Sequence, residues 1–427
     1  MNAPFGQTVE LDVQPAAAWS RLSSDWRALA EQAPNASFFL TADWADAWMR
    51  TFGEALQPDV LVFRAGGRAV GACMLVRRAV RVGPVPVTRL FLNMAGEDEA
   101  EDTTIEYNDV LCLDGWQNAV AGRLAAWLGT RQWDEFLATG LRGGAIAATL
   151  EQIALRSSEP SRVARPSYYV DLAAARRSSP EFDQCIGARS RKNVRRYLNL
   201  YRELGEIRTD VPADAEGAVA MLDEMIALHQ ATWRNRGKPG AFASPRIVEM
   251  HRGLVRRTFR AGATQLIRVA AGDTVIGIAY NFVFRGKVCA YQQGLRLEPD
   301  RRLHPGFVTT ACAIQYCLDH GFEDYDHLAG SHIDKQAMST GSRTLEWVSW
   351  RRRTMATRAV DVLKRVRAAV TRPARPEREP DKEVSSRGGG RARGAPAGRT
   401  LVGRAVPELP PHRQRRRERV RPRPLER

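Results

Sequence analysis

The chain has 427 residues and a formal net charge of +16, and 44% of its residues are hydrophobic. This length exceeds one ordinary hydrophobic core, so two domains are expected, and the apolar content is that of a globular protein. Because no stretch of about 18 uncharged apolar residues occurs, a membrane-spanning helix is not expected. The N-terminal sequence MNAPFGQTVELDVQP lacks the basic and apolar regions of a secretory signal, which predicts a cytoplasmic protein.

The positive charge is concentrated at the C-terminal end. Residues 371–427 contain 16 arginines and one lysine against seven acidic residues, so this segment carries +10 of the total charge. Such a composition cannot bury enough apolar surface to offset its ordering entropy, and residues 356–427 are expected to form a disordered basic tail. The tail could bind nucleic acid or an anionic surface by charge alone. A solvated tail without a dedicated partner, or an out-of-frame translation of GC-rich DNA, would have the same composition.

Cysteine and histidine spacing argues against metal and disulfide chemistry. The six cysteines include no Cys-x-x-Cys pair, so buried free thiols in a reducing compartment are expected. The histidines show neither HxH nor HExxH spacing, and no metal site is predicted.

The first half of the chain alternates helical and strand patterns. A helix with Thr41 at its N-cap is expected within residues 38–53, because the apolar residues there recur at helical spacing. The segment 59–79 reads as two strands joined by a Gly-Gly turn. The elements expected next, in chain order, are strands at 87–95 and 107–113, a helix at 116–129, a strand at 133–139, a helix at 144–157 and an extended segment at 162–173.

A basic helix at 189–204 opens the second half. Its apolar residues, among them Val194, Tyr197 and Tyr201, form one stripe, which leaves a cationic face that is either solvated or binds an anion. Serine, proline and glycine at the ends of 244–262 predict a capped helix. The other expected elements are strands at 206–211 and 325–330, helices at 214–237 and 306–320, three strands within 264–297 and a last strand pair around 343–353.

A faint internal repeat links the two halves. The sequence GGRAVGACMLV at 66–76 is similar to AGDTVIGIAYNFV at 271–283, with Gly71 and Gly277 in comparable places. The two segments are about 206 residues apart, which suggests a duplicated fold, although any hairpin can show such a pattern.

The order of elements in the second half resembles the GNAT acetyltransferase fold. The segments SRKNVRRYLNLYRELGEIRTDV, LHQATWRNRGKPGAF, VIGIAYNFVFRGKVCAYQQG and LHPGFVTTACAIQYCLDHGFEDYDHLAG, together with Lys335, resemble its double-domain CelD-like branch, also called Acetyltransf-6. This branch is related to Fem-type peptidyltransferases. The resemblance covers residues 185–352 well and residues 20–175 loosely.

The resemblance implies an α/β (α+β) protein of two tandem GNAT-like domains, each a mixed central sheet flanked by helices. It says nothing about the basic tail, whose disorder is expected from composition alone. The expected domains are a degenerate one at 1–180 and the acyltransferase domain at 181–355, followed by the tail at 356–427. The implied co-substrate is acetyl-CoA or another acyl-CoA, without a metal. The common cofactor loop of this fold has two glycines, whereas RRLHPGF supplies only Gly306.

The loop before the helix at 306–320 suits a coenzyme A diphosphate. A helix N-terminus offers free backbone N–H groups and a positive dipole end, and Gly306 lets a phosphate approach without a Cβ in the way. Arg301 and Arg302 add positive charge. An ordinary helix start after a solvated turn is the alternative. With the resemblance, Arg301, Arg302, Gly306, Phe307 and Gln293 are the expected cofactor-binding residues.

Acyl transfer also needs a polarised carbonyl and a proton acceptor. Backbone N–H groups of residues 291–294 would polarise the thioester, and Tyr291, His304 and Asp326 are the catalytic candidates. No single glutamate is identified as a base, so positioning with proton transfer through water is an alternative. The acceptor-binding candidates are Trp233, Arg236, Lys238 and Lys335, and His332 is a further possible base.

Three functions are compatible with these features. The first is an acyl-CoA-dependent N- or O-acyltransferase, most simply an N-acetyltransferase, which the CelD-like resemblance links to exopolysaccharide or cellulose metabolism. The second is a Fem-like transferase that takes an aminoacyl group from tRNA and holds RNA on the basic helix. The third is a basic adaptor without catalysis. The acceptor and the oligomeric state are not readable from the sequence, and nucleic-acid binding by the tail is not favoured.

Overall fold

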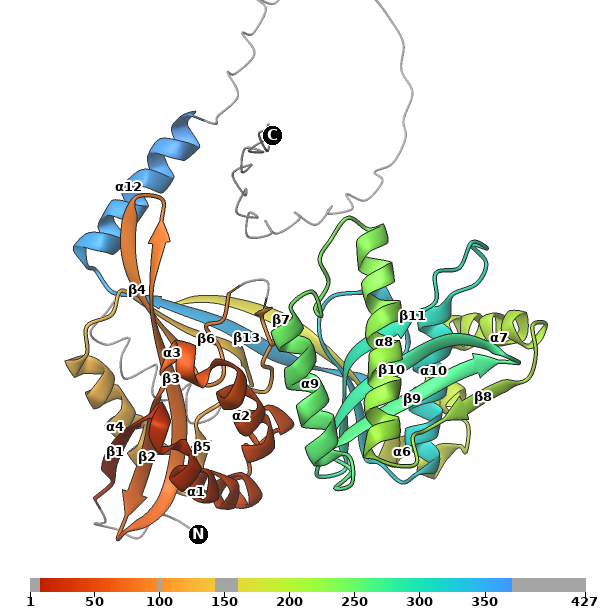
Figure 1. The fold of residues 1–427 in the computed structure, drawn as a ribbon, viewed down its shortest axis with the longest axis horizontal. Coiled ribbons are helices and arrows are strands. Elements are labelled where there is room, and N and C mark those ends of the chain that lie inside the picture. The colour runs from red at the N-terminus through yellow and green to blue at the C-terminus, as the bar shows by residue number, and fades with distance from the viewer. Residues whose placement is uncertain (1–7, 99–100, 143–159, 371–427) are drawn as a thin grey trace, which may run out of the picture. The chain divides into compact units, whose positions relative to one another are not determined.

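The computed structural model describes residues 8–98, 101–142 and 160–370 (Figure 1). These described residues belong to one compact unit. The helix expected at 144–157 and the tail beyond residue 370 lie outside the described residues.

The described strands and helices follow one another in mixed order along the chain. The strands are β1 (Glu10–Pro15), β2 (Asp59–Ala65), β3 (Arg68–Val82), β4 (Val85–Leu92), β5 (Leu111–Cys112), β6 (Glu135–Leu141), β7 (Ser161–Asp171), β8 (Ile207–Asp210), β9 (Thr264–Ala271), β10 (Thr274–Phe284), β11 (Lys287–Leu295), β12 (Asp324–Ala329) and β13 (Gly341–Arg351). The helices are α1 (Trp19–Gln32), α2 (Ala42–Trp48), α3 (Glu54–Leu56), α4 (Gln117–Thr130), α6 (Leu172–Ser178), α7 (Ala188–Arg202), α8 (Ala215–Asn235), α9 (Pro245–Thr258), α10 (Pro305–Asp319), α11 (Ile333–Ala337) and α12 (Met355–Val370).

Local sequence accounts for where several helices begin. The hydroxyl of Thr41 accepts a hydrogen bond from the Trp44 amide at 3.3 Å and caps α2. Ser244 caps α9 in the same way, accepting from the Arg246 amide at 3.3 Å, and Pro245 occupies the first turn, where its missing N–H costs nothing. Both caps agree with the sequence prediction.

One sheet of 13 strands runs through the unit in the order β1-β2-β3-β4-β6-β13-β7-β12-β11-β10-β9-β8, with β5 beside β3. In the first half, β1 to β4 are antiparallel, and β6 is parallel to β4. In the second half, β8 to β11 are antiparallel, and β12 is parallel to β11. The two halves therefore repeat one strand order, and the expected tandem mixed-sheet architecture is confirmed.

The repeat extends to single residues. The pairing of β2 with β3 leaves Val70 unpaired just before Gly71, and the pairing of β9 with β10 leaves Ile276 unpaired just before Gly277. A Cβ on Gly71 would lie 3.0 Å from Val120 of α4, and a Cβ on Gly277 would lie 2.4 Å from Thr309 of α10. Each glycine lets the helix of its own half approach the sheet closely. The faint sequence repeat thus marks equivalent bulges.

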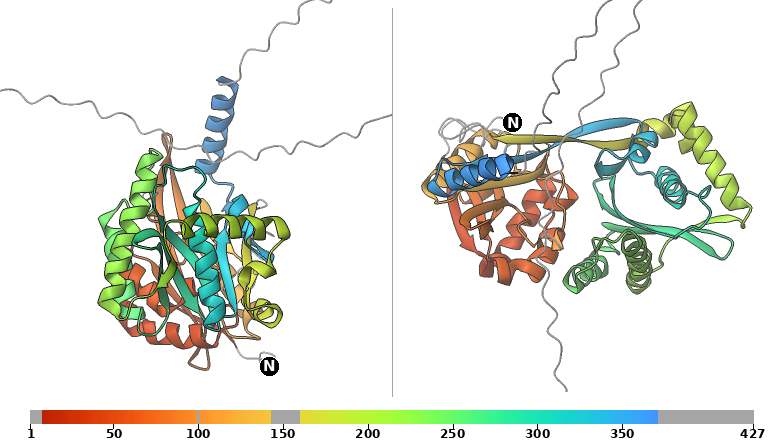
Figure 2. Two further views of the ribbon diagram at one scale, coloured as in Figure 1. Left: turned by 90° about the vertical axis from the view of Figure 1, so that its right-hand side faces the viewer. Right: turned by 90° about the horizontal axis from the view of Figure 1, so that it is seen from above.

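The last strand of each half is exchanged with the other half. Strand β7 pairs with β12 of the second half, and β13 pairs with β6 of the first half. The two strands also pair with each other, from Ser161 opposite Ser349 to Tyr169 opposite Gly341 (Figure 2, right). The strand pair expected around 343–353 is instead the single strand β13, which has a partner on both sides.

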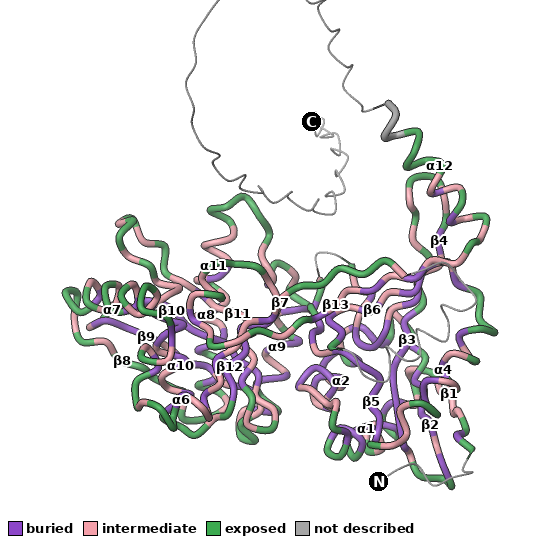
Figure 3. Tube along the Cα trace, turned by 180° about the vertical axis from the view of Figure 1, so that it is seen from behind, coloured by how far each residue is buried: buried purple, intermediate pink, exposed green. Residues whose placement is uncertain are grey.

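Apolar side chains fill both faces of the second half's sheet. Ile278, Tyr280 and Phe282 of β10 join the cluster that includes α8, α9 and the first half, whereas Ala279 joins the cluster with α7 and α10. This alternation is the period of two expected for a strand, and the buried stretches along these strands are visible in Figure 3. Phe38 of the first half stacks on Phe282 with ring centroids 4.2 Å apart.

Part of the segment that was expected to be a disordered tail is helical. Residues 355–370 form α12, although the sequence analysis placed the start of a disordered tail at 356. Val360 of α12 is buried, and Leu363 approaches Gly83 at the turn between β3 and β4. This packing stabilises a helix whose sequence is too basic to be recognised as part of a core.

Candidate functional site

The two parallel strands β11 and β12 separate in the second half. Only Lys287, Val288 and Cys289 of β11 pair with β12, so the edge of β11 from Ala290 to Leu295 has no strand beside it there. Tyr291 is an extra residue in the pairing with β10, a bulge that redirects the strand at this point. A cavity of about 530 Å³ opens where the strands part.

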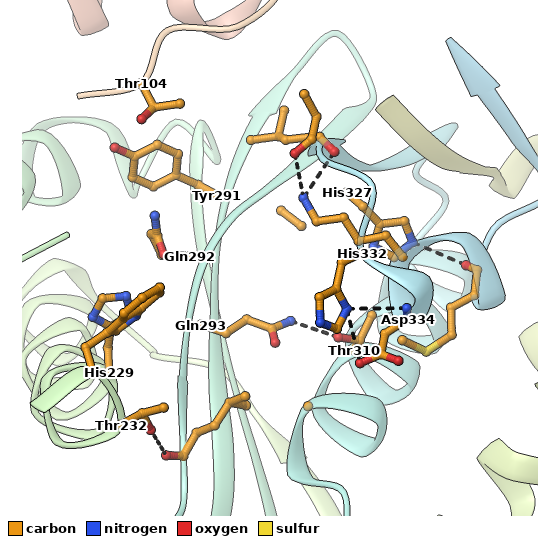
Figure 4. Close-up of a pocket in the computed structure, with 18 of the residues that line it drawn as sticks. Thr104, His229, Thr232, Tyr291, Gln292, Gln293, Thr310, His327, His332 and Asp334 are labelled. Atoms are coloured by element: carbon orange, nitrogen blue, oxygen red, sulfur yellow. Dashed lines mark hydrogen bonds and ion pairs between the residues drawn. The ribbon is translucent and has the colours of Figure 1, made fainter. Parts of the chain in front are cut away.

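Five parts of the chain form the wall of this cavity (Figure 4). They are the free edge of β11, the end of α8, the start of α10, the segment from the end of β12 into α11, and a loop of the first half. Gln292 and Gln293 lie on opposite sides of β11 in Figure 4, and the side chain of Gln293 donates to the Thr310 hydroxyl at 2.9 Å. The lining residues are Thr104, Glu106, His229, Thr232, Trp233, Arg236, Ala290, Tyr291, Gln292, Gln293, Leu295, Gly306, Thr310, His327, Leu328, Ala329, His332, Asp334, Lys335 and Met338.

The first turn of α10 presents bare backbone to the cavity. His304 is the N-cap residue and Pro305 is in the first turn. Gly306 lines the cavity, and its amide has no hydrogen-bond partner among the described residues. Its φ is not positive, and a Cβ there would lie 3.3 Å from a terminal methyl of Leu295. A free amide on an open helix end fits a phosphate group of an acyl-CoA.

The charged and aromatic residues around this turn lie outside the cavity wall. Arg301 is exposed, and the guanidinium of Arg302 binds Asp300 at 2.8 Å, which neutralises part of its charge locally. The exposed ring of His304 packs on Tyr197 of α7 with centroids 4.3 Å apart, and Phe307 packs on the same tyrosine at 5.3 Å. Arg301, Arg302 and His304 therefore do not line the cavity. The ring of His304 contacts α7 instead.

Asp326 occupies a different place from the one expected for a catalytic base. It is buried and does not line the cavity. Its carboxylate accepts hydrogen bonds from Tyr107, from Ser167 at 2.7 Å, from the Leu328 amide at 2.7 Å and from Arg343 at 2.9 Å. With four donors around it, this carboxylate joins β12 to β7, β13 and the first half, and it lies away from the cavity in which a catalytic base was expected.

Tyr291 and Lys335 both line the cavity, and both are held by backbone oxygens. The Tyr291 hydroxyl donates to Thr103 O at 3.0 Å, and burial raises its pKa well above the usual range. The ammonium of Lys335 donates to Ala329 O at 2.9 Å and to Leu328 O at 3.2 Å. Burial lowers the pKa of Lys335, while Glu106 and Asp326 act in the opposite direction.

Glu106 was not identified from the sequence. It is 4% exposed, lines the cavity, and accepts a hydrogen bond from the Ala329 amide at 2.7 Å. Burial raises its pKa to about 7, although this amide and the charge of Lys335 oppose the shift. The residue lies in a loop just before the short strand expected at 107–113, so no periodic pattern in the sequence marks it.

The acceptor-side candidates divide between the wall and the surface. Trp233 and Arg236 line the cavity, whereas Lys238 does not, although its ammonium lies 5.8 Å from the Trp233 ring. His229 of α8 was also missed by the sequence analysis. Its ring is buried in the wall, burial lowers its pKa, and it lies 5.9 Å from Trp233.

The corresponding gap in the first half is filled by the chain itself. Strands β4 and β6 pair only through Arg89, Leu90 and Phe91 of β4, as β11 and β12 do at their start. Beyond that point Asn108 bridges to Leu141, and its side chain accepts from Asn93 at 2.5 Å. The sequence NMAGEDEAED at 93–102, which follows β4, is acidic and unsuited to a diphosphate.

Two features are absent from the described part of the chain. Within residues 8–98, 101–142 and 160–370, no group of three or more His, Cys, Asp or Glu side chains could hold a metal ion. None of the helices in these same ranges is long and apolar enough to cross a membrane. All six cysteines are free thiols.

Comparison with known families agrees with this geometry. Residues 188–336 match the family described as "Acetyltransferase (GNAT) domain". The matched residues lie in the second half of the chain, where the sequence resemblance to this family was expected. None of the curated proteins compared with this chain matches it.

One solved structure shares the fold across both halves, and others are similar at lower scores. FemX is similar with a TM-score of 0.52 and 11% identity, over 80% of this chain and 98% of FemX. The C-terminal domain of a putative lysylphosphatidylglycerol synthetase from Agrobacterium fabrum is similar with a TM-score of 0.46 and 10% identity, over 81% of this chain and 96% of that one. A tandem GNAT protein from the clavulanic acid biosynthesis pathway has a TM-score of 0.40 and 14% identity, over 79% and 98%.

Proposed function

We propose that this protein transfers an acyl group, most simply acetyl, from an acyl-CoA to an amine or hydroxyl acceptor. The observation that carries the proposal is the separation of β11 from β12, with a cavity between the free edge of β11 and the first turn of α10. A free strand edge can donate backbone N–H groups to a thioester carbonyl and stabilise the charge that develops on its oxygen. The open amide of Gly306 supplies a donor for the diphosphate.

The residues around the cavity have different roles in this proposal. The bulge at Tyr291 turns the strand edge toward the opening, and Gln293 is held in place by Thr310. Trp233 and Arg236, at the end of α8, form the side on which an acceptor would enter. The resemblance suggests an amine or hydroxyl group related to exopolysaccharide as the acceptor. This suggestion needs its own test.

Calorimetry with coenzyme A and acetyl-CoA tests the donor, and a panel of amino sugars, amino acids and small amines with thiol release as the readout tests the acceptor. We expect saturable binding of acetyl-CoA and release of free thiol with at least one acceptor. Absence of both heat and thermal shift with acetyl-CoA and longer acyl-CoAs would contradict the proposal.

A second candidate function is transfer of an aminoacyl group from tRNA. The observation in its favour is the basic face of α7, on which Arg189 and Lys192 are both exposed. Part of this charge is neutralised, because Arg195 binds Asp183 at 2.5 Å. Filter binding with bulk tRNA decides between the two, since the tRNA mechanism requires tight binding that weakens steeply with salt.

A further inference from the structure

We propose that Glu106, contributed by the first half, is the general base that accepts the proton of the acceptor in the cavity of the second half. This proposal rests on the proposed acyl transfer and assigns to it the proton acceptor that the sequence did not reveal. It makes the first half a part of the active site.

Three contacts from one short loop fix the position of Glu106. Upstream, Thr103 O accepts from the hydroxyl of Tyr291 at the bulge of β11. Glu106 itself accepts from the amide of Ala329 at the end of β12. Downstream, the Tyr107 hydroxyl donates to Asp326. The loop therefore connects the two strands where they part, and the carboxyl group faces the space in which a thioester carbonyl on the edge of β11 would be attacked.

The backbone of this loop is in an unusual conformation. Thr104 and Tyr107 have φ angles of 46° and 52°, and Leu328, one residue before the Ala329 contact, has a φ of 60°. Residues with side chains occupy this left-handed region at a cost in energy, and such strain concentrates at functional sites. The loop holds its shape here because its side chains and carbonyls are bound on both sides.

The other titratable groups of the wall are less suited to the role. Asp334 lies at the exposed side of the cavity, and its carboxylate is 3.3 Å from the ring of His332. Burial lowers the pKa of His327 to about 4 and also lowers that of His229, so both rings hold a proton weakly at neutral pH. Glu106 combines burial, a place in the wall and a pKa raised to about 7, close to the value at which a base works best near neutrality.

The charges that face Glu106 come from three other elements. The positive groups are Lys335 of α11 and Arg165 of β7, and the negative group is Asp326 of β12. Lys335 is anchored by two carbonyl oxygens, so its charge stays near the carboxylate in both protonation states. Neighbouring positive charge limits the rise in pKa, and the carboxyl group can therefore be ionised at neutral pH.

The proposed transfer begins with the removal of a proton from the acceptor. An acceptor ammonium gives one proton to Glu106, which passes it to solvent, and the freed lone pair attacks the thioester carbonyl carbon. The C–N bond forms, and the C–S bond breaks with its electron pair going to sulfur. The nitrogen then loses its second proton to Glu106 as the amide forms. The thiolate takes up one proton and becomes the free thiol.

The test compares Glu106→Gln with Glu97→Gln in the full chain. Glu97 is a matched control because burial also raises its pKa to about 7, and it is held by Trp48 at 2.6 Å and Thr103 at 2.7 Å, yet it does not line the cavity. Each variant is measured for coenzyme A affinity by calorimetry, for thermal midpoint, and for thiol release from acetyl-CoA with methylamine and with hydroxylamine. Methylamine must lose a proton before it attacks, whereas hydroxylamine is largely uncharged at neutral pH.

We expect Glu106→Gln to bind coenzyme A as the native protein does and to lose about 100-fold in kcat with methylamine. The loss with hydroxylamine is expected to be about tenfold or less, and the rise of kcat with pH through about 7 is expected to disappear. Glu97→Gln should keep native kinetics, and Glu106→Asp should keep the pH dependence with a reduced kcat. Native kcat and pH profile in Glu106→Gln, or equal losses in both glutamine variants, would overturn the assignment of Glu106. Absence of coenzyme A binding and thiol release in the native protein would instead overturn the acyltransferase function itself.

Discussion

At the scale of single residues, two glycines beside the cavity are constrained for different reasons. Gly306 is open toward the cavity and meets only the end of the flexible Leu295 side chain. Gly294 is closed in, since a Cβ on it would lie 2.1 Å from the carbonyl oxygen of Met225 in α8. The first glycine matters for a ligand, and the second matters for the packing of α8 against β11.

Replacing Gly306 by valine should therefore affect binding more than stability. A branched side chain would occupy the space of a phosphate, so coenzyme A affinity should fall by about tenfold or more, which corresponds to about 1.4 kcal/mol. Stability should change by less than about 1 kcal/mol, because the φ of this residue is not positive. Calorimetry and urea unfolding check both values. Gly129→Val, in open space on α4, serves as the control, and the idea fails if both variants bind equally well.

Replacing Gly294 by alanine should destabilise the protein by about 3 kcal/mol, because α8 must move away from the strand. Gly129→Ala should have the opposite sign and stabilise by up to about 1 kcal/mol, since its Cβ meets no atom within 4 Å and alanine favours the helix. Urea unfolding of the two variants measures the difference. A neutral Gly294→Ala would show that α8 does not approach β11 this closely.

The buried histidine His251 predicts a pH dependence of stability. Burial lowers its pKa from 6.5 to about 3, so the folded state stays neutral while the unfolded state takes up a proton below pH 6.5. The unfolded state is then favoured as the pH falls from 6.5 toward 3. Replacing His251 by phenylalanine removes this contribution. Between pH 7 and pH 4.5, the free energy of unfolding of the variant should therefore rise by about 2 kcal/mol relative to that of the native protein. Urea titrations at both pH values measure this gain, and parallel curves would contradict the burial of this ring.

At the scale of elements, the exchanged strands β7 and β13 are held by one buried charge network. Arg343 of β13 binds Asp324 and Asp326 of β12, and its guanidinium lies 3.7 Å from the centre of the Tyr169 ring of β7. Both aspartates are almost completely buried. Burial raises the pKa of Asp324, and Arg343 opposes that rise. The arginine thus compensates two carboxylates that would otherwise be buried without a counter-charge.

Replacing Arg343 by methionine should destabilise the protein by about 3–5 kcal/mol, because it leaves two buried carboxylates without their partner. The triple variant in which Asp324 and Asp326 are also replaced by asparagine should recover part of the loss. Chemical unfolding at neutral pH gives both values. If the single variant were as stable as the native chain, the network would not be the junction that we describe.

At the scale of the whole molecule, the two halves share a fold and differ in what fills the gap between their parallel strands. In the first half, Asn93 and Asn108 close the gap with their own hydrogen bonds. The same loop then continues through Glu106 to the cavity of the second half. The first half therefore contributes part of the wall of the cavity in the second half.

One coenzyme A should consequently bind per chain. The open gap lies between β11 and β12, whereas the side chains of Asn93 and Asn108 occupy the corresponding gap of the first half. Calorimetry of the full chain should give a stoichiometry of one, and replacing Gly306 by valine should weaken that single site. A second site that persists in the Gly306→Val variant would place a cofactor in the first half.

Local pattern in the sequence was sufficient for most elements, and the resemblance to the GNAT family implied the fold class. Alternating apolar residues predicted the hairpins β2–β3 and β9–β11, serine and threonine caps placed α2 and α9, and Gly306 marked the start of α10. These features depend on neighbours within a few residues, where chain geometry alone decides the outcome. The sequence also singled out Tyr291, Gln293, Gly306, Trp233, Arg236 and Lys335, which the structure brings to one cavity.

Only the tertiary structure shows how the surroundings of the two buried carboxylates, Asp326 and Glu106, differ. Asp326 and Glu106 are both acidic residues at the edge of an apolar segment, and nothing in their local sequence separates them. Asp326 is surrounded by donors from β7, β13 and the first half, whereas Glu106 reaches across from the first half to Ala329. The exchange of β7 and β13 brings these distant segments together, and the burial and charge that set a carboxylate's chemistry come from such contacts rather than from its neighbours in sequence.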